Sequence, residues 1–243
     1  MDINKSKLLL GKPIYIDAFG TIYQPTLDEI LDYDNYQLVN LIFSTDIEMV
    51  GIENRELYKN FDVFFFKDVD GNYVYQYEGI SMIDILIDIL KFYLKKEDIF
   101  LYQKKDMIPI VVLDDNHVLY RDNFDELAKV MLLINHTEKA SIEKPPKLKN
   151  EKHKDIWEKL KKGRERQAEK RGGIETIINE VIHCGRSYIS YKEIVQMTMY
   201  QLFNSYESIM KIDRFYTNFK QYLVGVSPDK LDLTHWSEAL TIK

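Results

Sequence analysis

The feature that most constrains the fold is a break in the apolar pattern at residues 143–150. The segment Glu143-Lys-Pro-Pro-Lys-Leu-Lys-Asn150 has no apolar periodicity and contains two adjacent prolines, which is typical of a linker. A chain of 243 residues is long enough for two modest domains that each bury a core. We therefore predict an N-terminal domain over residues 1–140, a linker and basic charged helix over 141–172, and a helical domain over 173–243.

Charge is distributed unevenly over these parts. The net charge of −6 divides into −12 for residues 1–143, +7 for residues 144–171 and −1 for the remainder. The chain is too acidic for a general DNA-binding protein, but the middle segment is basic. The first residues hold only a three-residue apolar run, and no run approaches the ~20 residues that span a bilayer. We expect a cytoplasmic protein without a signal peptide or membrane contact.

The N-terminal part mixes strand and helix patterns, which predicts an α+β fold. Residues 12–19 alternate like a strand that Gly20 ends, and residues 22–25 are extended because Pro25 restricts the residue before it. Thr26 can cap a helix over 27–43. A β-hairpin is predicted at 61–77, because Asp70-Gly71 suits a tight turn. The other elements expected are a helix at 82–94, strands at 99–103, 108–113 and 117–120, and a helix at 123–135.

The C-terminal part has only helical patterns. Apolar residues from Ile174 to Ile182 fall on one face of a helix that Gly185 stops, and Ser190 with Glu193 forms a capping box. A long amphipathic stretch follows to Leu223, with a break expected near residues 204–205. We expect its apolar side chains to form a buried face. Pro228 ends the run, and a last short helical turn is expected near residues 233–240.

One enzymatic alternative rests on residues 14–22. The strand that ends in Asp17-Ala-Phe-Gly20-Thr21 is similar to the first motif of the haloacid dehalogenase superfamily, which would make Asp17 the nucleophile of a phosphohydrolase. The resemblance would assign Ser44-Thr45 to the second motif, Asp114-Asp115 to the metal-binding motif, and Lys104 or Lys105 to phosphate neutralisation. Phe19 stands where phosphatases of that family carry their acid–base aspartate, so we predict that the chain is not an enzyme.

Metal and cofactor sites are not predicted. Asp68-Val-Asp70-Gly71 has the spacing of a calcium loop, but Phe66 and Tyr77 would occupy ligand positions that need oxygen donors. Cys184 is the single cysteine, and neither it nor His183 has neighbours at zinc-binding spacing. We expect this His-Cys pair to face the core.

The basic segment leaves three interpretations open. Acidic residues alternate with its cations at helical spacing, so the simplest interpretation is a solvated helix. The second is a helix that docks on an acidic protein surface through Trp157, Arg164, Arg166 and Arg171. Nucleic-acid binding is the third and the weakest, because no nucleic-acid-binding motif accompanies the charge.

Two segments carry a resemblance that covers most of the chain. They are Ile22-Tyr-Gln-Pro-Thr-Leu-Asp-Glu-Ile30 and Tyr191-Lys-Glu-Ile194 leading to Met197-Thr-Met-Tyr-Gln-Leu202, followed by an aromatic helix and a tail with His235-Trp236. The chain resembles proteins that long-tailed phages of Gram-positive hosts encode between their tail-tube and tape-measure genes. One departure is Asp34, where a glycine is expected after the first helix.

This resemblance implies a non-enzymatic tail assembly factor of the host cytoplasm. A tail assembly chaperone would bind the tape-measure protein and help to recruit tail-tube subunits; a structural virion protein is the close alternative. A tape-measure protein exposes apolar helical seams until the tube encloses it, and amphipathic helices suit contact with such seams. Trp157, the three arginines, His235 and Trp236 are the expected contact residues. Homo-oligomerisation stays open.

Overall fold

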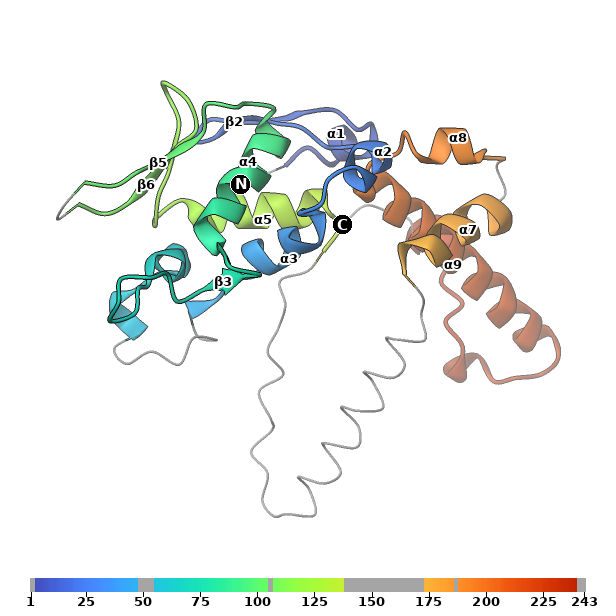
Figure 1. Ribbon diagram of the computed structural model, residues 1–243. Coiled ribbons are helices and arrows are strands. Elements are labelled where there is room, and N and C mark those ends of the chain that lie inside the picture. Colours follow the sequence, from blue (N-terminus) through green and yellow to red (C-terminus); the bar gives the residue numbers. More distant parts are fainter. Residues whose placement is uncertain (1–2, 48–54, 105–106, 138–172, 186–187, 240–243) are drawn as a thin grey trace, which may run out of the picture. The chain divides into compact units, whose positions relative to one another are not determined.

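The computed structural model describes residues 3–47, 55–104, 107–137, 173–185 and 188–239 (Figure 1). The chain divides into two compact units. Unit 1 comprises residues 1–140 together with 196–200, and unit 2 comprises 141–195 and 201–243. The predicted linker and basic helix lie outside the described residues. None of the helices within the described ranges is long and apolar enough to cross a bilayer.

Unit 1 begins with a short helix and a two-stranded hairpin. Helix α1 (Lys5–Leu9) precedes β1 (Ile14–Ile16), which pairs antiparallel with β2 (Gly20–Ile22). Gly20 has a φ of +80°, a conformation that favours glycine in the turn. Ile14, Ile16 and Ile22 are buried. The strand expected at 12–19 is shorter than predicted, because residues 17–19 form the turn and Gly20 is the first residue of β2.

The single helix expected at 27–43 is wrong, because the chain forms α2 (Leu27–Leu31) and α3 (Tyr36–Phe43). Thr26 caps α2 in a capping box with Glu29, as predicted. The interruption places Tyr33 and Asn35 where both donate hydrogen bonds to Asp88, at 2.6 and 2.8 Å. These charge-assisted bonds stabilise the break.

The hairpin expected at 61–77 is only partly formed. The 3₁₀ helix η2 (Arg55–Leu57) precedes the hairpin, and the 3₁₀ helix η3 (Asn60–Phe65) replaces its first strand. A helical turn lets Phe61 and Phe64 point the same way, and both rings pack on Phe124 with centroid distances of 5.6 and 5.4 Å. The turn at 68–72 does form, with a bridge between Lys67 and Tyr73, and β3 (Gln76–Tyr77) pairs with β4 (Ile80–Ser81) instead.

The rest of unit 1 follows the predicted order. Ser81 caps α4 (Met82–Leu94), and an antiparallel sheet of β5 (Phe100–Tyr102), β6 (Ile110–Val112) and β7 (Val118–Leu119) follows in that order. Helix α5 (Phe124–Ile134) completes the run. The buried faces of α3, α4 and α5 form one apolar core with side chains from the strands. The α+β prediction is confirmed for this unit.

A short segment from the C-terminal part of the sequence completes unit 1. Thr198 forms an antiparallel bridge with Thr26, and the Leu27 N–H donates to the Met197 carbonyl at 2.8 Å. Tyr200 is buried within the core of unit 1, its ring 5.5 Å from that of His136. The two segments that carry the phage-protein resemblance therefore contact each other here.

Unit 2 is helical, as predicted. Its elements are α7 (Ile174–Cys184), α8 (Tyr191–Ile194) with the expected Ser190–Glu193 capping box, η4 (Pro228–Lys230) and α10 (Trp236–Ala239), together with α9 (Met199–Leu223) from residue 201 onward. The break expected at 204–205 is wrong. Helix α9 runs through these residues, and the chain breaks at 195–198 because Thr198 is extended in its bridge to Thr26.

Candidate protein-binding site

The residues predicted to contact a partner are only partly described. Trp157, Arg164, Arg166 and Arg171 lie outside the described residues, so their role stays a prediction. His235 and Trp236 are described, at the start of α10. His235 is exposed and Trp236 is partly buried.

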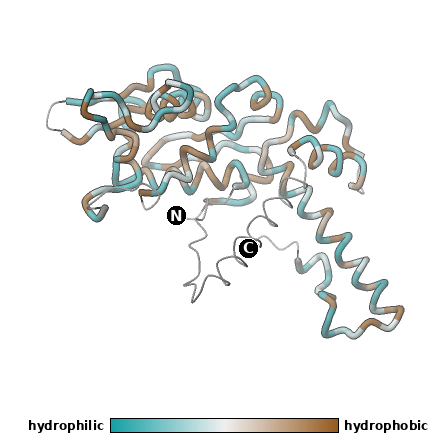
Figure 2. Tube along the Cα trace, turned by 60° about the horizontal axis from the view of Figure 1, so that its bottom comes forward, coloured by the Kyte–Doolittle hydropathy of each residue, from teal (hydrophilic) through white to brown (hydrophobic). Residues whose placement is uncertain are grey.

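An aromatic stripe runs along the C-terminal half of α9. Its members lie three or four residues apart, which places them on one face of a helix. We define the α9 stripe as Ile212, Phe215, Tyr216, Phe219, Tyr222 and Leu223. Figure 2 shows hydrophobic and hydrophilic positions alternating along the helices of this unit.

The α9 stripe is largely uncovered, although the sequence pattern predicts a buried face. Phe219 is 42% exposed and Leu223 is 66% exposed. Phe215 stacks on Phe219 with ring centroids 6.0 Å apart, and Phe219 lies 6.5 Å from Tyr222. The correction has a simple reason: periodicity identifies the apolar face of a helix, but not whether another element packs on it. Contiguous apolar surface of this kind marks interaction sites.

The chain after α9 turns back and extends this surface. Gly225 has a φ of +92°, and the Val226 N–H donates to the Gln221 carbonyl at 3.1 Å, as in a Schellman helix end. Asn218 then donates from its side chain to the Asp232 carbonyl at 2.9 Å. This bond holds the returning segment against the helix.

His235 and Trp236 join the α9 stripe through ring contacts. The His235 ring lies 5.1 Å from Phe215 in an edge-to-face arrangement and 5.1 Å from Trp236. The imidazole Nδ1 also contacts the Ser237 hydroxyl at 2.6 Å. His235 and Trp236, which the sequence predicts as partner contacts, therefore belong to the same aromatic cluster as the α9 stripe.

A groove between α7 and α9 adjoins the stripe. Its volume is about 260 Å³, and Val181, Ile189, Ile209 and Ile212 provide its apolar lining. Cys184 also lines this groove and is exposed, as is His183, which contacts the Tyr191 hydroxyl at 3.2 Å. The expectation of a core-facing His-Cys pair is therefore wrong. Ile212 belongs to both the groove and the stripe, so the apolar surface is continuous.

The residues of the enzymatic alternative lie in unit 1. Asp17 is exposed in the β1–β2 turn, whereas Ser44 is buried at the end of α3. Lys104 is exposed after β5, and Lys105 is outside the described residues. Asp114 lies in the turn between β6 and β7, close to Gly20: a Cβ on that glycine would lie 3.9 Å from its Oδ2.

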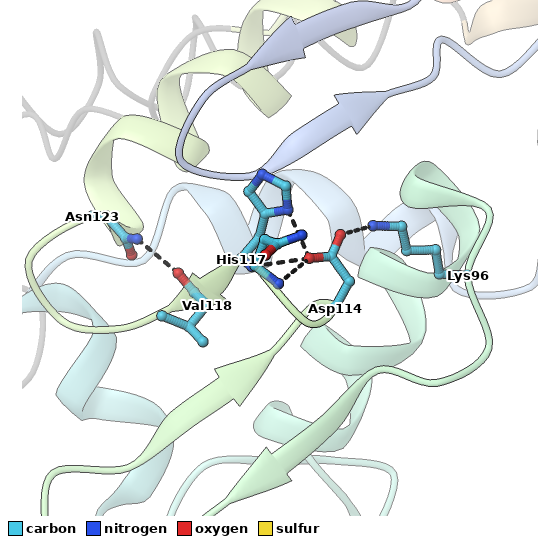
Figure 3. Close-up of polar contacts among 6 residues, drawn as sticks. Lys96, Asp114, His117, Val118 and Asn123 are labelled. Carbon is cyan, nitrogen blue, oxygen red and sulfur yellow. Dashed lines mark hydrogen bonds and ion pairs between the residues drawn. The ribbon is translucent and has the colours of Figure 1, made fainter.

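The Asp114 carboxylate is already occupied by its neighbours. Lys96 donates to Oδ2, while the backbone N–H groups of Asn116 and His117 donate to Oδ1 at 2.8 and 2.9 Å (Figure 3). The His117 ring also contacts Oδ1 at 2.7 Å. The Lys96 bond, with those from Asn116 and His117, holds the pKa of Asp114 well below its usual range. This set of bonds joins α4 to the β6–β7 turn.

Within the described ranges, no group of three or more His, Cys, Asp or Glu side chains is placed to hold a metal ion. The turn at 68–72 is built from bonds to Asp68, whose carboxylate accepts the N–H groups of Asp70 and Asn72 at 2.9 Å. That carboxylate therefore stabilises a tight turn.

Comparison with known proteins gives one finding for unit 2. Residues 167–241 match a model of the YomV second domain, a phage-derived family. No curated protein and no solved structure matches the chain. The matched range contains the α9 stripe, the α7–α9 groove, His235 and Trp236. The candidate binding site therefore lies inside the part of the chain that is similar to a phage domain.

Proposed function

We propose that this chain is a non-enzymatic phage tail assembly factor that binds the tape-measure protein through unit 2 and helps to recruit tail-tube subunits in the host cytoplasm. The observation that carries the proposal is the exposed α9 stripe, located within the range that matches a phage-derived domain. The similarity supports a phage origin. The stripe supports a helical partner, because apolar residues three and four apart on one helix can pack against the apolar seam of a second helix.

The chemistry of the partner follows from the surface. A helix with an apolar seam would bury aromatic rings of the α9 stripe and Trp236, and large aromatic side chains contribute strongly to protein interfaces. Before a tape-measure protein is enclosed by the tube, it presents such seams over its length. Acidic unit 1 would keep the assembled complex soluble.

Co-expression with the tape-measure protein of the same phage tests the proposal. We expect the two proteins to co-purify, and the soluble fraction of the tape-measure protein to increase. A tape-measure protein that stays insoluble and does not co-purify would contradict the proposal. If the chain is present in purified virions, the structural-protein alternative is favoured, since a chaperone leaves before the particle is complete.

The basic segment is tested separately. Reversing charge at Arg164, Arg166 and Arg171 should weaken co-purification if this segment contacts the partner. Unchanged co-purification would assign these residues to a solvated helix and leave unit 2 as the contact. Retention on nucleic acid that falls steeply with salt would instead support the third interpretation.

A further inference from the structure

The three-stranded sheet of unit 1, formed by β5, β6 and β7, is apolar on both faces. On the inner face, Leu101 pairs with Val111, which pairs with Leu119, and the last two are fully buried. On the outer face, Phe100 is 51% exposed and Tyr102 is 47% exposed. An antiparallel sheet with one solvated face normally carries polar residues there. This outer face therefore has the composition of a contact surface.

Strand β5 is also an open edge of this sheet. It pairs only with β6, and none of the described residues donates to or accepts from its other backbone edge. Figure 1 shows the β5–β6 hairpin projecting away from the helices of unit 1. Residues 99–103 contain neither proline nor a charged side chain, which are the usual means of protecting an edge strand.

The sequence of β5 fits a second copy of itself. We propose that β5 pairs antiparallel with β5 of a second copy, in a register centred on Leu101, so that two units form one six-stranded sheet. This register places Phe100 opposite Tyr102 of the partner subunit and Asp98 opposite Lys104 of the partner subunit. Two-fold symmetry repeats each pair. Cross-strand aromatic and opposite-charge pairs both stabilise antiparallel sheets.

Charge complementarity selects the second copy as the occupant of this edge. Asp98 and Lys104 are both exposed and lie three residues before and after Leu101. A parallel arrangement of the two copies would place Asp98 beside Asp98, which is unfavourable. This inference concerns unit 1 alone, so it stands or fails independently of tape-measure binding by unit 2.

Charge reversal tests the dimer through its mass in solution. The wild-type chain should have twice the 28.9 kDa mass of the monomer. Asp98→Lys or Lys104→Asp creates two like-charge pairs and should raise the dimer dissociation constant on the order of tenfold or more. The double variant restores both pairs and should restore the dimer. Asp70→Lys makes the same charge change at an exposed turn and should have no effect.

Three outcomes of this experiment would overturn the proposal. They are a monomeric wild-type chain at every concentration, a dimer that tolerates both single reversals, and a double variant that stays monomeric while its circular dichroism matches that of the wild-type chain. A dimer that tolerates both reversals would place self-association elsewhere on the molecule.

Cysteine pairing tests the register. In a Cys184→Ser background, Phe100→Cys and Tyr102→Cys chains are mixed and oxidised. Opposed residues of antiparallel strands lie ~4.5–5.5 Å apart at Cα, within the range of a disulfide. We expect the crosslink in the mixture and not in either variant alone. No crosslink in the mixture, or an equal crosslink in one variant alone, would contradict the register.

Discussion

The two units of this chain use apolar residues in opposite ways. In unit 1, α4 alone buries eight side chains, and the surrounding elements cover the core they form. In unit 2, α7 buries only Val181, and the C-terminal half of α9 leaves aromatic rings exposed. The helices of unit 1 bury apolar faces in a shared core, although Phe100 and Tyr102 of β5 are exposed, whereas the C-terminal half of α9 in unit 2 leaves its apolar face open, as a partner-binding surface does. The predictions below test this contrast.

The largest difference in stability is expected between truncating a buried aromatic ring in unit 1 and truncating an exposed one in unit 2. Phe124 is buried against Phe43, Phe61 and Phe64, so Phe124→Ala should lower the free energy of unfolding by about 3–5 kcal/mol. Phe219→Ala on the α9 stripe should lower it by less than about 1 kcal/mol, because the ring is already partly solvated. Urea unfolding of both variants measures the difference. Equal losses would contradict the contrast between the units.

A buried polar network of unit 1 should give the next largest effect. The Asn135 Oδ1 accepts from the hydroxyls of Tyr93 and Tyr36 at 2.6 and 3.2 Å, and its Nδ2 donates to the Met131 carbonyl at 2.7 Å. Asn135→Leu leaves both hydroxyls without this acceptor. It should lower the free energy of unfolding by about 2–3 kcal/mol. Tyr36→Phe removes a single, longer bond and should cost less. Thermal unfolding measures both losses. An Asn135→Leu chain that unfolds at the same temperature as the wild-type chain would show that this network does not stabilise unit 1.

Removing a helix cap should lower the free energy of unfolding by a similar amount in each unit, and by less than the loss of the Asn135 network. Thr26 and Ser190 each form a capping box, with Glu29 and Glu193. Thr26→Ala and Ser190→Ala should each lower the free energy of unfolding by about 1 kcal/mol. Thr26→Ser should have a smaller effect, because serine can also cap the helix. Hydrogen exchange locates each loss: Thr26→Ala should raise exchange in α2, and Ser190→Ala in α8. Exchange raised in the other unit by either change would argue against separate cores.

The smallest effect concerns acid stability of unit 1. The folded-state pKa of Asp114 lies below its unfolded value because Lys96 donates to the carboxylate. Its contribution is therefore fully present above about pH 4 and is lost as the pH falls below that value. Lys96→Met should lower the free energy of unfolding near neutral pH. It should also reduce the further loss of that free energy as the pH falls below about 4. A pH profile parallel to that of the wild-type chain would contradict the assignment.

Local signals were enough to predict several elements from the sequence. The predicted capping residues Thr26 and Ser190 mark helix starts correctly, and the apolar periodicity predicts α4, α5 and α7. The composition of the aromatic run at 61–66 favours a strand, whereas the chain forms the 3₁₀ helix η3 there. Its helical turn depends on Phe124, about sixty residues away, which no local pattern indicates.

The candidate site was predictable in composition but not in exposure. Spacing predicts an apolar face that continues along the helix to Leu223, and the role of His235 and Trp236 as partner contacts stays a prediction. Whether Phe219 is covered depends on the packing of other elements, and the bridge between Thr26 and Thr198 joins residues far apart in the chain. Both are tertiary properties that periodicity does not encode.

The most direct test of the central claim compares two faces of α9. Met210 and Phe219 are 43% and 42% exposed, and their separation of nine residues places them on opposite sides of the helix. Phe219→Asp should reduce capture of the co-expressed tape-measure protein at least tenfold, since a charge is buried without a partner at the contact. Met210→Asp should leave capture unchanged. Equal capture by the two variants would contradict the assignment of the α9 stripe as the binding surface.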